Sequence, residues 1–111
     1  PDFDLLQFGT MSVDMGAQTD VPEGRAKCAT NNGKPFALFH VGTNFYCLDN
    51  TCTHLGGPLC QGKLDGFTVT CPWHGSRFDV RTGQVVGPPA RKPVRSYPVV
   101  LQGGRIWVDL P

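Results

Sequence analysis

The stretch from Cys52 to His74 constrains this 111-residue chain more than any other part of its sequence. It opens with Cys52-Thr53-His54 and closes with Cys71-Pro72-Trp73-His74, and sixteen residues separate His54 from Cys71. Each motif supplies one thiol and one imidazole from a short segment. These donors suit zinc, copper or an iron–sulfur cluster, whereas calcium and magnesium prefer oxygen ligands. The pattern predicts a metal centre, with zinc and an iron–sulfur cluster as the alternatives.

Residues beyond the four donors continue a specific pattern: Leu59 to Gly66, Arg77-Phe78-Asp79, Thr82-Gly83 and Gly87-Pro88-Pro89-Ala90. Together with the donors, they resemble the Rieske [2Fe–2S] proteins, and only the first twenty residues lack a clear counterpart. The resemblance implies that Cys52 and Cys71 bind one buried iron, and that His54 and His74 bind the other iron, nearer to solvent. Zinc ribbons and fingers prefer Cys-x₂₋₄-Cys and His-x₃₋₅-His within each half, so the cluster is favoured over zinc.

The mixed ligand set predicts a higher reduction potential than that of four-cysteine ferredoxins, because two neutral imidazoles leave the oxidised site near zero charge. By resemblance, Ser76 matches a serine that bonds a bridging sulfide in high-potential Rieske proteins. Phe78 stands where those proteins have a tyrosine that bonds a cysteine sulfur. With one donor kept and one absent, we expect a potential low in the Rieske range.

Three further residues are expected around the cluster on the same resemblance. Trp73 is either a contact residue for a partner or a hydrophobic lid over the cluster, and the lid is favoured. Gly75 follows the second histidine, and Pro88 lies on a third loop that would help to cover the cluster.

The remaining cysteines, Cys28, Cys47 and Cys60, are predicted to be free thiols, because iron–sulfur assembly needs reduced thiols and intracellular proteins seldom carry disulfides. Rieske subunits of respiratory and photosynthetic complexes have a disulfide between the two cluster loops, at places that match Gly57 and Trp73 here. Neither position is a cysteine in this chain.

The fourteen glycines and ten prolines indicate many tight turns, and no 3.6-residue periodicity stands out. We expect an all-β Rieske-type antiparallel sandwich or barrel of nine or ten strands. The chain is interpreted as one domain, residues 1–111, with a cluster-binding subdomain over about 48–89 and a base from the remainder.

Strands are expected at 5–8, 25–30, 36–41, 45–48, 67–70, 76–80, 85–86, 94–101 with a break at Pro98, and 106–110. A loop should follow the first strand, and residues 62–66 should form a turn. Asn31-Asn32-Gly33 predicts a hairpin, because Asn and Gly tolerate positive φ. Alternate residues of 36–41 are apolar on both faces, apart from His40, which indicates a strand buried on both sides.

The formal net charge of +1 gives no argument for a nucleic-acid or anionic-membrane partner. No apolar run approaches the length of a membrane helix and no signal segment opens the chain, so we expect a soluble, cytoplasmic protein. Five cationic residues lie in the stretch 77–95 after the second motif: Arg77, Arg81, Arg91, Lys92 and Arg95. They form either a solvated surface or a docking patch for an acidic partner.

The chain has no room for the large domain in which Rieske oxygenases bind a mononuclear iron, and His40 is its only other histidine. We therefore expect an electron carrier instead of an enzyme: a monomeric ferredoxin that passes single electrons from a flavin-dependent reductase to a terminal oxygenase. The alternatives are a Rieske-like small subunit of a nitrite reductase and a stand-alone carrier of another pathway.

Overall fold

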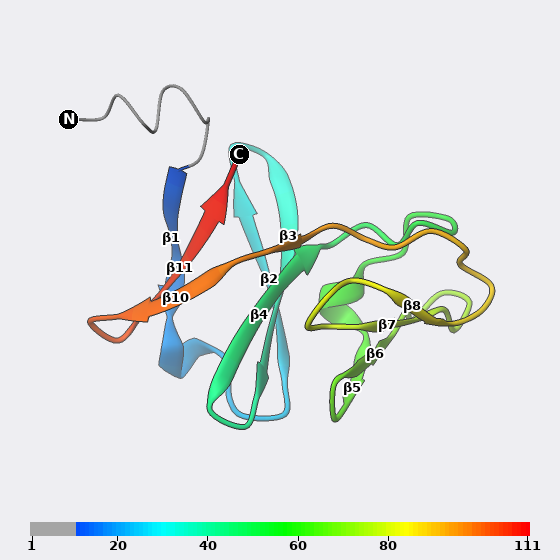
Figure 1. Ribbon diagram of the computed structural model, residues 1–111, viewed down its shortest axis with the longest axis horizontal. Coiled ribbons are helices and arrows are strands. Elements are labelled where there is room, and N and C mark those ends of the chain that lie inside the picture. The colour runs from blue at the N-terminus through cyan, green and yellow to red at the C-terminus, as the bar shows by residue number, and fades with distance from the viewer. Residues whose placement is uncertain (1–10) are drawn as a thin grey trace.

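The computed structural model describes residues 11–111, which form three antiparallel sheets with two short 3₁₀ segments and no α-helix (Figure 1). The first sheet has the order β1-β11-β10, with β1 at Met11–Ala17, β10 at Val99–Gln102 and β11 at Arg105–Leu110. The second has the order β2-β3-β4-β9, with β2 at Ala26–Asn31, β3 at Lys34–Val41, β4 at Asn44–Asp49 and β9 at Ser96–Tyr97. The third has the order β5-β6-β7-β8, with β5 at Lys63–Asp65, β6 at Thr68–Thr70, β7 at Arg77–Asp79 and β8 at Val85–Gly87.

The 3₁₀ segments are η1 at Gln18–Asp20 and η2 at Leu59–Gln61. The all-β, antiparallel prediction is confirmed, with eleven strands in the described part of the chain instead of nine or ten. Residues 11–111 include no helix long and apolar enough to cross a membrane.

β3 separates two hydrophobic cores because its side chains alternate between two buried faces. Phe36 and Leu38 pack with Ile106 and Val108 of the first sheet. Ala37 and Phe39 face the other way, into a core that contains both Cys52 and Cys71. The expectation of a strand buried on both sides is confirmed, and β3 is the wall against which the metal-binding loops pack.

His40, near the end of β3, is the exception to the apolar pattern. Its Nδ1 lies 2.7 Å from the carbonyl oxygen of Val21, and its ring stacks on Phe45 at 3.9 Å between centroids. His40 is thus a hydrogen-bonded packing residue and has a different role from the histidines of the two Cys/His motifs.

Short-range turn signals are confirmed. Asn32 and Gly33 have φ values of 51° and 80° and join β2 to β3. Gly42, with φ of 64°, joins β3 to β4. Positive φ at consecutive residues matches the right-handed twist of paired strands, so local chemistry is sufficient to specify the first hairpin.

Predictions failed where pairing depends on distant residues. The loop expected after residue 8 is instead β1, which pairs with β11 from Met11↔Leu110 to Asp14↔Trp107. The turn expected at 62–66 is wrong, since Lys63–Asp65 forms β5 against β6. Both strands are mostly polar or mixed in sequence, and hydrogen bonds to a partner strand organise them. The strand expected at 5–8 lies outside the described residues.

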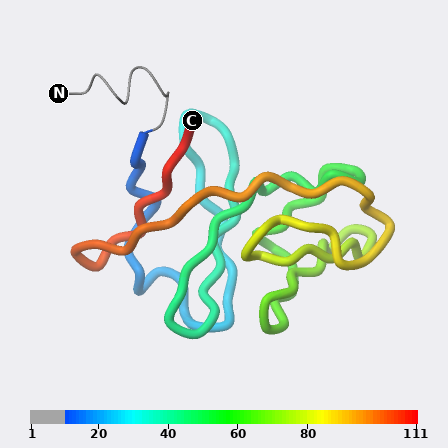
Figure 2. The backbone as a smooth tube through the Cα atoms, viewed as in Figure 1, coloured from blue at the N-terminus to red at the C-terminus, as the bar shows by residue number. Residues whose placement is uncertain are grey.

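The segment that leads to the third sheet and the segment that returns from it lie side by side at the edge of the second sheet. β4 leads from the second sheet toward the third, and the return segment, residues 88–95, gold to orange in Figure 2, runs back to β9 and β10. Cys47 and Leu48 of β4 pair with Tyr97 and Ser96, and the N–H of Asp49 donates to the carbonyl oxygen of Arg95. The third sheet and its loops therefore extend from one end of the molecule, which measures 45 × 29 × 22 Å.

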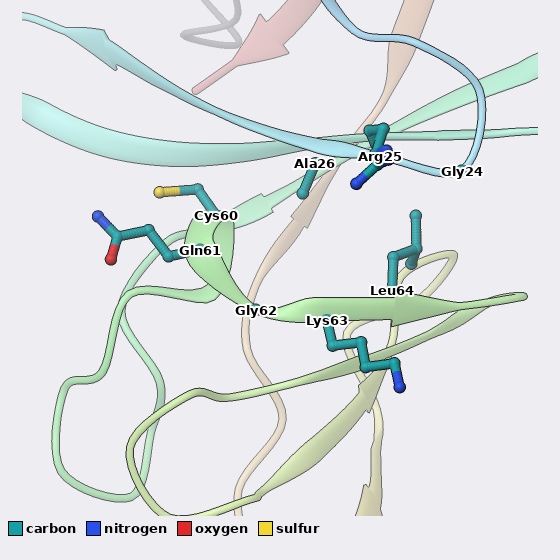
Figure 3. A pocket seen from close by; sticks show the side chains of 8 residues that line it. All are labelled: Gly24, Arg25, Ala26, Cys60, Gln61, Gly62, Lys63 and Leu64. Carbon is teal, nitrogen blue, oxygen red and sulfur yellow. The ribbon is translucent and has the colours of Figure 1, made fainter.

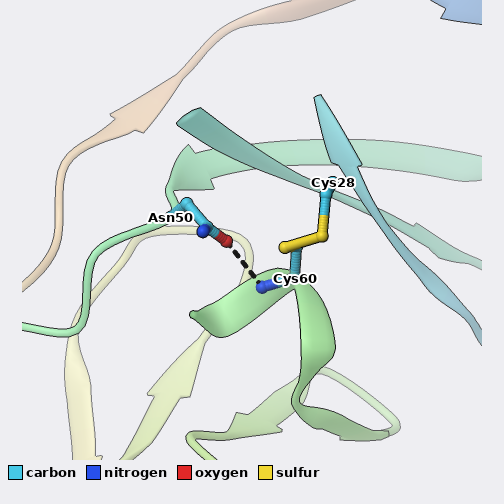
Figure 4. The surroundings of a disulfide bond; sticks show 3 residues. All are labelled: Cys28, Asn50 and Cys60. Atoms are coloured by element: carbon cyan, nitrogen blue, oxygen red, sulfur yellow. Dashed lines mark hydrogen bonds between the residues drawn. A yellow bond between two sulfur atoms is a disulfide. The ribbon is translucent and has the colours of Figure 1, made fainter. Parts of the chain in front are cut away.

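Cys28 and Cys60 form a disulfide, so the prediction that both are free thiols is wrong (Figure 4). Cys28 lies on β2 and Cys60 on η2, which pack together. The Cα atoms of the two cysteines are 4.8 Å apart, although their positions differ by 32 in the sequence. That distance is within the normal range for a disulfide. Cys47 is a buried free thiol, as expected.

Candidate metal centre

The two motif loops have the same backbone hydrogen-bonding pattern. The N–H of Cys52 donates to the carbonyl of Gly57, and the N–H of Gly56 donates to the carbonyl of Cys52, both at 2.9 Å. In the second loop, the N–H of Cys71 donates to the carbonyl oxygen of Ser76 at 2.7 Å, and the N–H of Gly75 donates to the carbonyl oxygen of Cys71 at 3.1 Å.

Matching glycines make this shared turn possible. Gly56 and Gly75 each stand four residues after a cysteine, with φ values of 83° and 81° that side chains other than glycine rarely adopt. The N–H of Gly75 holds the second loop closed, and the local sequence thus builds two equivalent turns, each presenting one cysteine and one histidine.

The four donors divide into an inner pair and an outer pair. Cys52 and Cys71 are each only 3% exposed and belong to one hydrophobic core. His54 is half-buried and His74 is exposed, and their ring centroids lie 5.1 Å apart with the rings perpendicular. The thiols therefore face the interior and the imidazoles face the surface.

Burial raises the pKa of the Cys71 thiol, and the nearby Cys52 thiol raises that pKa further through a hydrogen bond. The backbone N–H groups of Trp73 and His74 donate to the Cys71 sulfur and oppose this shift. Such N–H donors stabilise a thiolate. The Cys71 sulfur is thus placed to become a metal-bound thiolate when a cation compensates its burial.

Gly57 leaves room for this sulfur. A Cβ at position 57 would lie 2.5 Å from the Sγ of Cys71, closer than atoms of this kind approach. The loop of the first motif thus passes directly against the donor of the second, and only glycine permits that approach.

The Ser76 hydroxyl is buried at 1% exposure and accepts a 3.0 Å hydrogen bond from the N–H of Ala90. This is the one hydrogen bond that the hydroxyl makes with residues 11–111, so its own hydrogen is free for a further acceptor. A buried donor of this kind needs an acceptor, and a sulfide held between the loops is one. The residues present therefore fit an iron–sulfur cluster better than a bare ion.

No three His, Cys, Asp or Glu side chains of the described chain surround a common point as ligands of one ion. The observed arrangement is two pairs, one of thiols and one of imidazoles. A [2Fe–2S] cluster needs two protein ligands for each iron, and inorganic sulfide completes both coordination shells.

Comparison with known proteins agrees with this geometry. The sequence matches the Rieske [2Fe-2S] domain family over residues 11–98. The chain belongs to the Rieske family. Its cofactor is accordingly a Rieske-type [2Fe–2S] cluster.

Two curated relatives of this Rieske protein are components of oxygenase systems. It is 38% identical over 98 residues to the ferredoxin component of the naphthalene 1,2-dioxygenase system of Pseudomonas aeruginosa, covering 88% of this chain and 94% of that protein. It is 39% identical over 100 residues to the ferredoxin component of the p-cumate 2,3-dioxygenase system of Pseudomonas putida, covering 88% and 85% of the two chains.

A solved structure shares the fold of this Rieske protein. In the complex of reduced oxygenase and oxidized ferredoxin in carbazole 1,9a-dioxygenase, one chain superposes with a TM-score of 0.83 and 33% identity. The match covers 87% of this chain and 91% of that chain.

The other residues expected around the cluster of this Rieske protein differ in exposure. Phe78 is completely buried on β7 and has no polar atom to offer a sulfur. Trp73 is 57% exposed, so it covers the loops only in part. Pro88 is exposed in the segment that follows β8, two residues before Ala90, whose N–H bonds Ser76.

Two supporting residues of this Rieske protein were missed at the sequence level. The buried Asn50 accepts a 2.7 Å hydrogen bond from the N–H of Cys60 through Oδ1, which ties the start of the first loop to η2 (Figure 4). Thr53, between the first two donors, donates a 2.6 Å hydrogen bond to the carbonyl of Lys92. Both partners are distant in sequence, although an Asn two residues before a cysteine motif is a recognisable turn signal.

A cleft of about 520 Å³ lies away from the donors, at the junction of β2 with η2 and β5 (Figure 3). Its lining consists of Gly24, Arg25, Ala26, Cys60, Gln61, Gly62, Lys63 and Leu64. It holds no histidine or carboxylate, and its cysteine is already in the disulfide. We therefore assign the metal chemistry to the two motif loops and not to this hollow.

Proposed function

We propose that this Rieske protein is a ferredoxin, a one-electron carrier that delivers electrons to a terminal oxygenase. The observation that carries the proposal is the division of the donors into a buried thiol pair and a surface imidazole pair. The ferredoxin components of dioxygenase systems, which this chain matches over most of their length, support the same role.

In this proposal, Cys52 and Cys71 hold the inner iron, and His54 and His74 hold the outer iron. When bound, the cluster supplies reversible one-electron chemistry in the upper range of [2Fe–2S] potentials. The protein buries the two thiols, away from water, in the core that also contains Ala37 and Phe39, and it leaves the imidazoles at the surface. A partner that contacts the exposed His74 would come within a short distance of the cluster.

The proposed partners are a flavin-dependent reductase as donor and a terminal oxygenase as acceptor, and the proposed working state is a monomer. The chain has only one such imidazole edge among its described residues, so the two partners would use it in turn. No catalytic residue is assigned. We further propose that residues 48–89 form the cluster-binding subdomain, with the base formed by the rest of the chain.

A redox titration of the purified protein, followed by electron paramagnetic resonance, tests this function first. We expect a reduced signal with an average g value below that of four-cysteine clusters, and a potential in the lower part of the Rieske range. Rapid reduction by an oxygenase-system reductase with NADH should follow. A clearly positive potential, or zinc in place of iron and sulfide, would contradict the proposal.

The nitrite reductase small subunit is the less favoured alternative, because such subunits often lack the ligands and all four donors are present here. A carrier for another pathway would show the same spectrum and potential. Electron delivery to an oxygenase, measured as substrate hydroxylation in a reconstituted system, distinguishes an oxygenase ferredoxin from a carrier of another pathway.

A further inference from the structure

A cleft of about 460 Å³ lies immediately beside His54. Its walls are Thr53 and His54 from the first loop, and Pro89, Ala90, Arg91 and Lys92 from the return segment. It is thus bounded on one side by a proposed cluster ligand and on the other by two cationic side chains.

Two hydrogen bonds fix the segment that carries Arg91 and Lys92 to the two motif loops. Thr53 Oγ1 donates a 2.6 Å hydrogen bond to the Lys92 carbonyl, and the N–H of Ala90 donates to Ser76. The return segment is therefore held on both sides of Arg91. Whatever binds Arg91 and Lys92 is consequently positioned next to His54.

Charge is distributed unevenly between the two ends of the molecule. Residues 50–95 contain six cationic side chains and only two carboxylates, Asp65 and Asp79. The rest of the described chain, residues 11–49 and 96–111, contains four cationic side chains and five carboxylates. The end that carries the imidazoles is thus positive, although the whole chain is close to neutral.

Pairing increases this contrast. In the base, Lys27, Lys34 and Arg105 each form an ion pair with a carboxylate, at 3.0–3.2 Å. By contrast, Arg91 and Lys92 are exposed and have no carboxylate of residues 11–111 within 4.0 Å. Their charges are available to an external anion.

We propose that this cleft receives a carboxylate side chain from the redox partner, whose surface around its own electron-transfer site is acidic. This docking surface, defined by Thr53, Arg91 and Lys92, rests on the proposed electron-carrier function and adds the chemistry of the partner to it. Charged groups at the rim of an interface mainly accelerate association and orient the partner. The cleft would thus place an acidic partner over His54 and leave the exposed Leu55 and Trp73 to contact apolar surface.

Small charged oxidants test the surface without a purified partner. The reduced holoprotein is mixed with ferricyanide, an anion of charge −3, or with hexaammineruthenium(III), a cation of charge +3, at increasing ionic strength. The ferricyanide rate should fall with salt and the hexaammineruthenium rate should rise. In Lys92→Glu, the ferricyanide rate at low salt should fall at least fivefold, and Lys92→Arg should keep the wild-type rate.

Arg25→Glu is the matched control, because it changes the net charge equally but lies in the base, before β2 (Figure 3). Its ferricyanide rate should stay within twofold of wild type. A hexaglutamate peptide should slow oxidation of the wild type and have no effect on Lys92→Glu. Equal slowing by Arg25→Glu and Lys92→Glu, or no change in Lys92→Glu, would overturn the docking surface.

Failure of the proposed function is recognised separately. If the holoprotein has no reducible cluster, no rate can be measured with either oxidant. If the cluster is reducible but the oxidation rates do not depend on the charge of the oxidant, the carrier function stands and only the acidic-partner inference fails.

Discussion

The indole of Trp73 lies directly over the backbone of Gly57. A Cβ at position 57 would be 3.0 Å from Cγ and 3.2 Å from Cδ2 of that ring. These are the two positions that match the loop-to-loop disulfide of respiratory and photosynthetic Rieske subunits. Here the loops meet at the same place, but an aromatic ring on a glycine replaces the covalent bond.

Gly57→Ala should therefore impair cluster retention. The added methyl group would press on the Cys71 sulfur at 2.5 Å and on the Trp73 ring, so the loops would have to separate. We expect less than half of the wild-type iron and acid-labile sulfide per chain, measured on protein purified anaerobically.

Gly24→Ala is the control for this prediction, since nothing lies within 4 Å of a Cβ there but φ is +79°. It should cost about 1 kcal/mol of stability through backbone strain and keep a full cluster. Full iron and sulfide content in Gly57→Ala would show that the loops adapt to the methyl group.

The reduction potential should depend on Ser76, whose hydroxyl can donate a hydrogen bond, and on Phe78, which has no donor. Ser76→Ala removes the buried hydroxyl and should lower the potential by roughly 50–100 mV, and Phe78→Tyr should raise it by a similar amount, the electrical equivalent of one hydrogen bond to a charged group. The measurement is a spectroelectrochemical titration of each variant.

Ser96→Ala, an exposed serine on β9, serves as the control and should leave the potential unchanged. An unaltered potential in Phe78→Tyr, with an intact cluster spectrum, would mean that position 78 does not reach a sulfur ligand.

The Cys28–Cys60 disulfide should stabilise the fold without tuning the cluster. It closes a loop of 32 residues between β2 and η2, and the loss of that restraint should lower the free energy of unfolding by about 3–4 kcal/mol. Denaturant unfolding with and without dithiothreitol measures the difference.

In Cys28→Ala, dithiothreitol should have no effect on stability, because the crosslink is already absent. The reduction potential should be the same in the wild type and in Cys28→Ala. A wild-type protein equally stable with and without reductant would show that the crosslink contributes nothing in solution.

Cys47 should be unreactive in the native protein and should make the fold sensitive to alkali. Burial, with a smaller contribution from Asp49, raises the pKa of its thiol to about 12 from an ordinary value near 9. The unfolded chain loses this proton first, so stability is full below about pH 9 and falls as the pH rises toward 12.

The pH dependence of unfolding should thus be shallower in Cys47→Ala than in the wild type between pH 9 and 11. Because the alanine also leaves a small cavity, the slope is compared, not the absolute stability. Iodoacetamide at pH 8 should alkylate Cys47 only after denaturation. Rapid alkylation of the native protein would contradict the buried position.

The two turns of the proposed metal centre could be predicted from the sequence because their determinants are local. Cys52-x-His54 and Cys71-x-x-His74 each lie within one turn, and Gly56 and Gly75 provide the positive φ that closes it. The hairpin at Asn32-Gly33 was recognisable for the same reason.

Pairings between distant segments could not be predicted in this way. β1 exists because it adds to β11, where Asp14 pairs with Trp107, 93 residues away, and the Asp14 carboxylate also forms an ion pair with Arg105. The disulfide depends on β2 lying against η2, and Tyr97 became a polar bridge between Lys34 and Asp49 only when β9 joined β4.

The sequence by itself determined the two turns that carry the proposed donors, the order of the hairpins and the alternation that buries both faces of β3, since each depends on neighbours a few residues apart. Only the tertiary structure decided which cysteines pair, that Gly57 supports Trp73, and that Arg91 and Lys92 flank His54. These relationships require long loops to close, and the packing of two cores around β3 selects the contacts that those loops make.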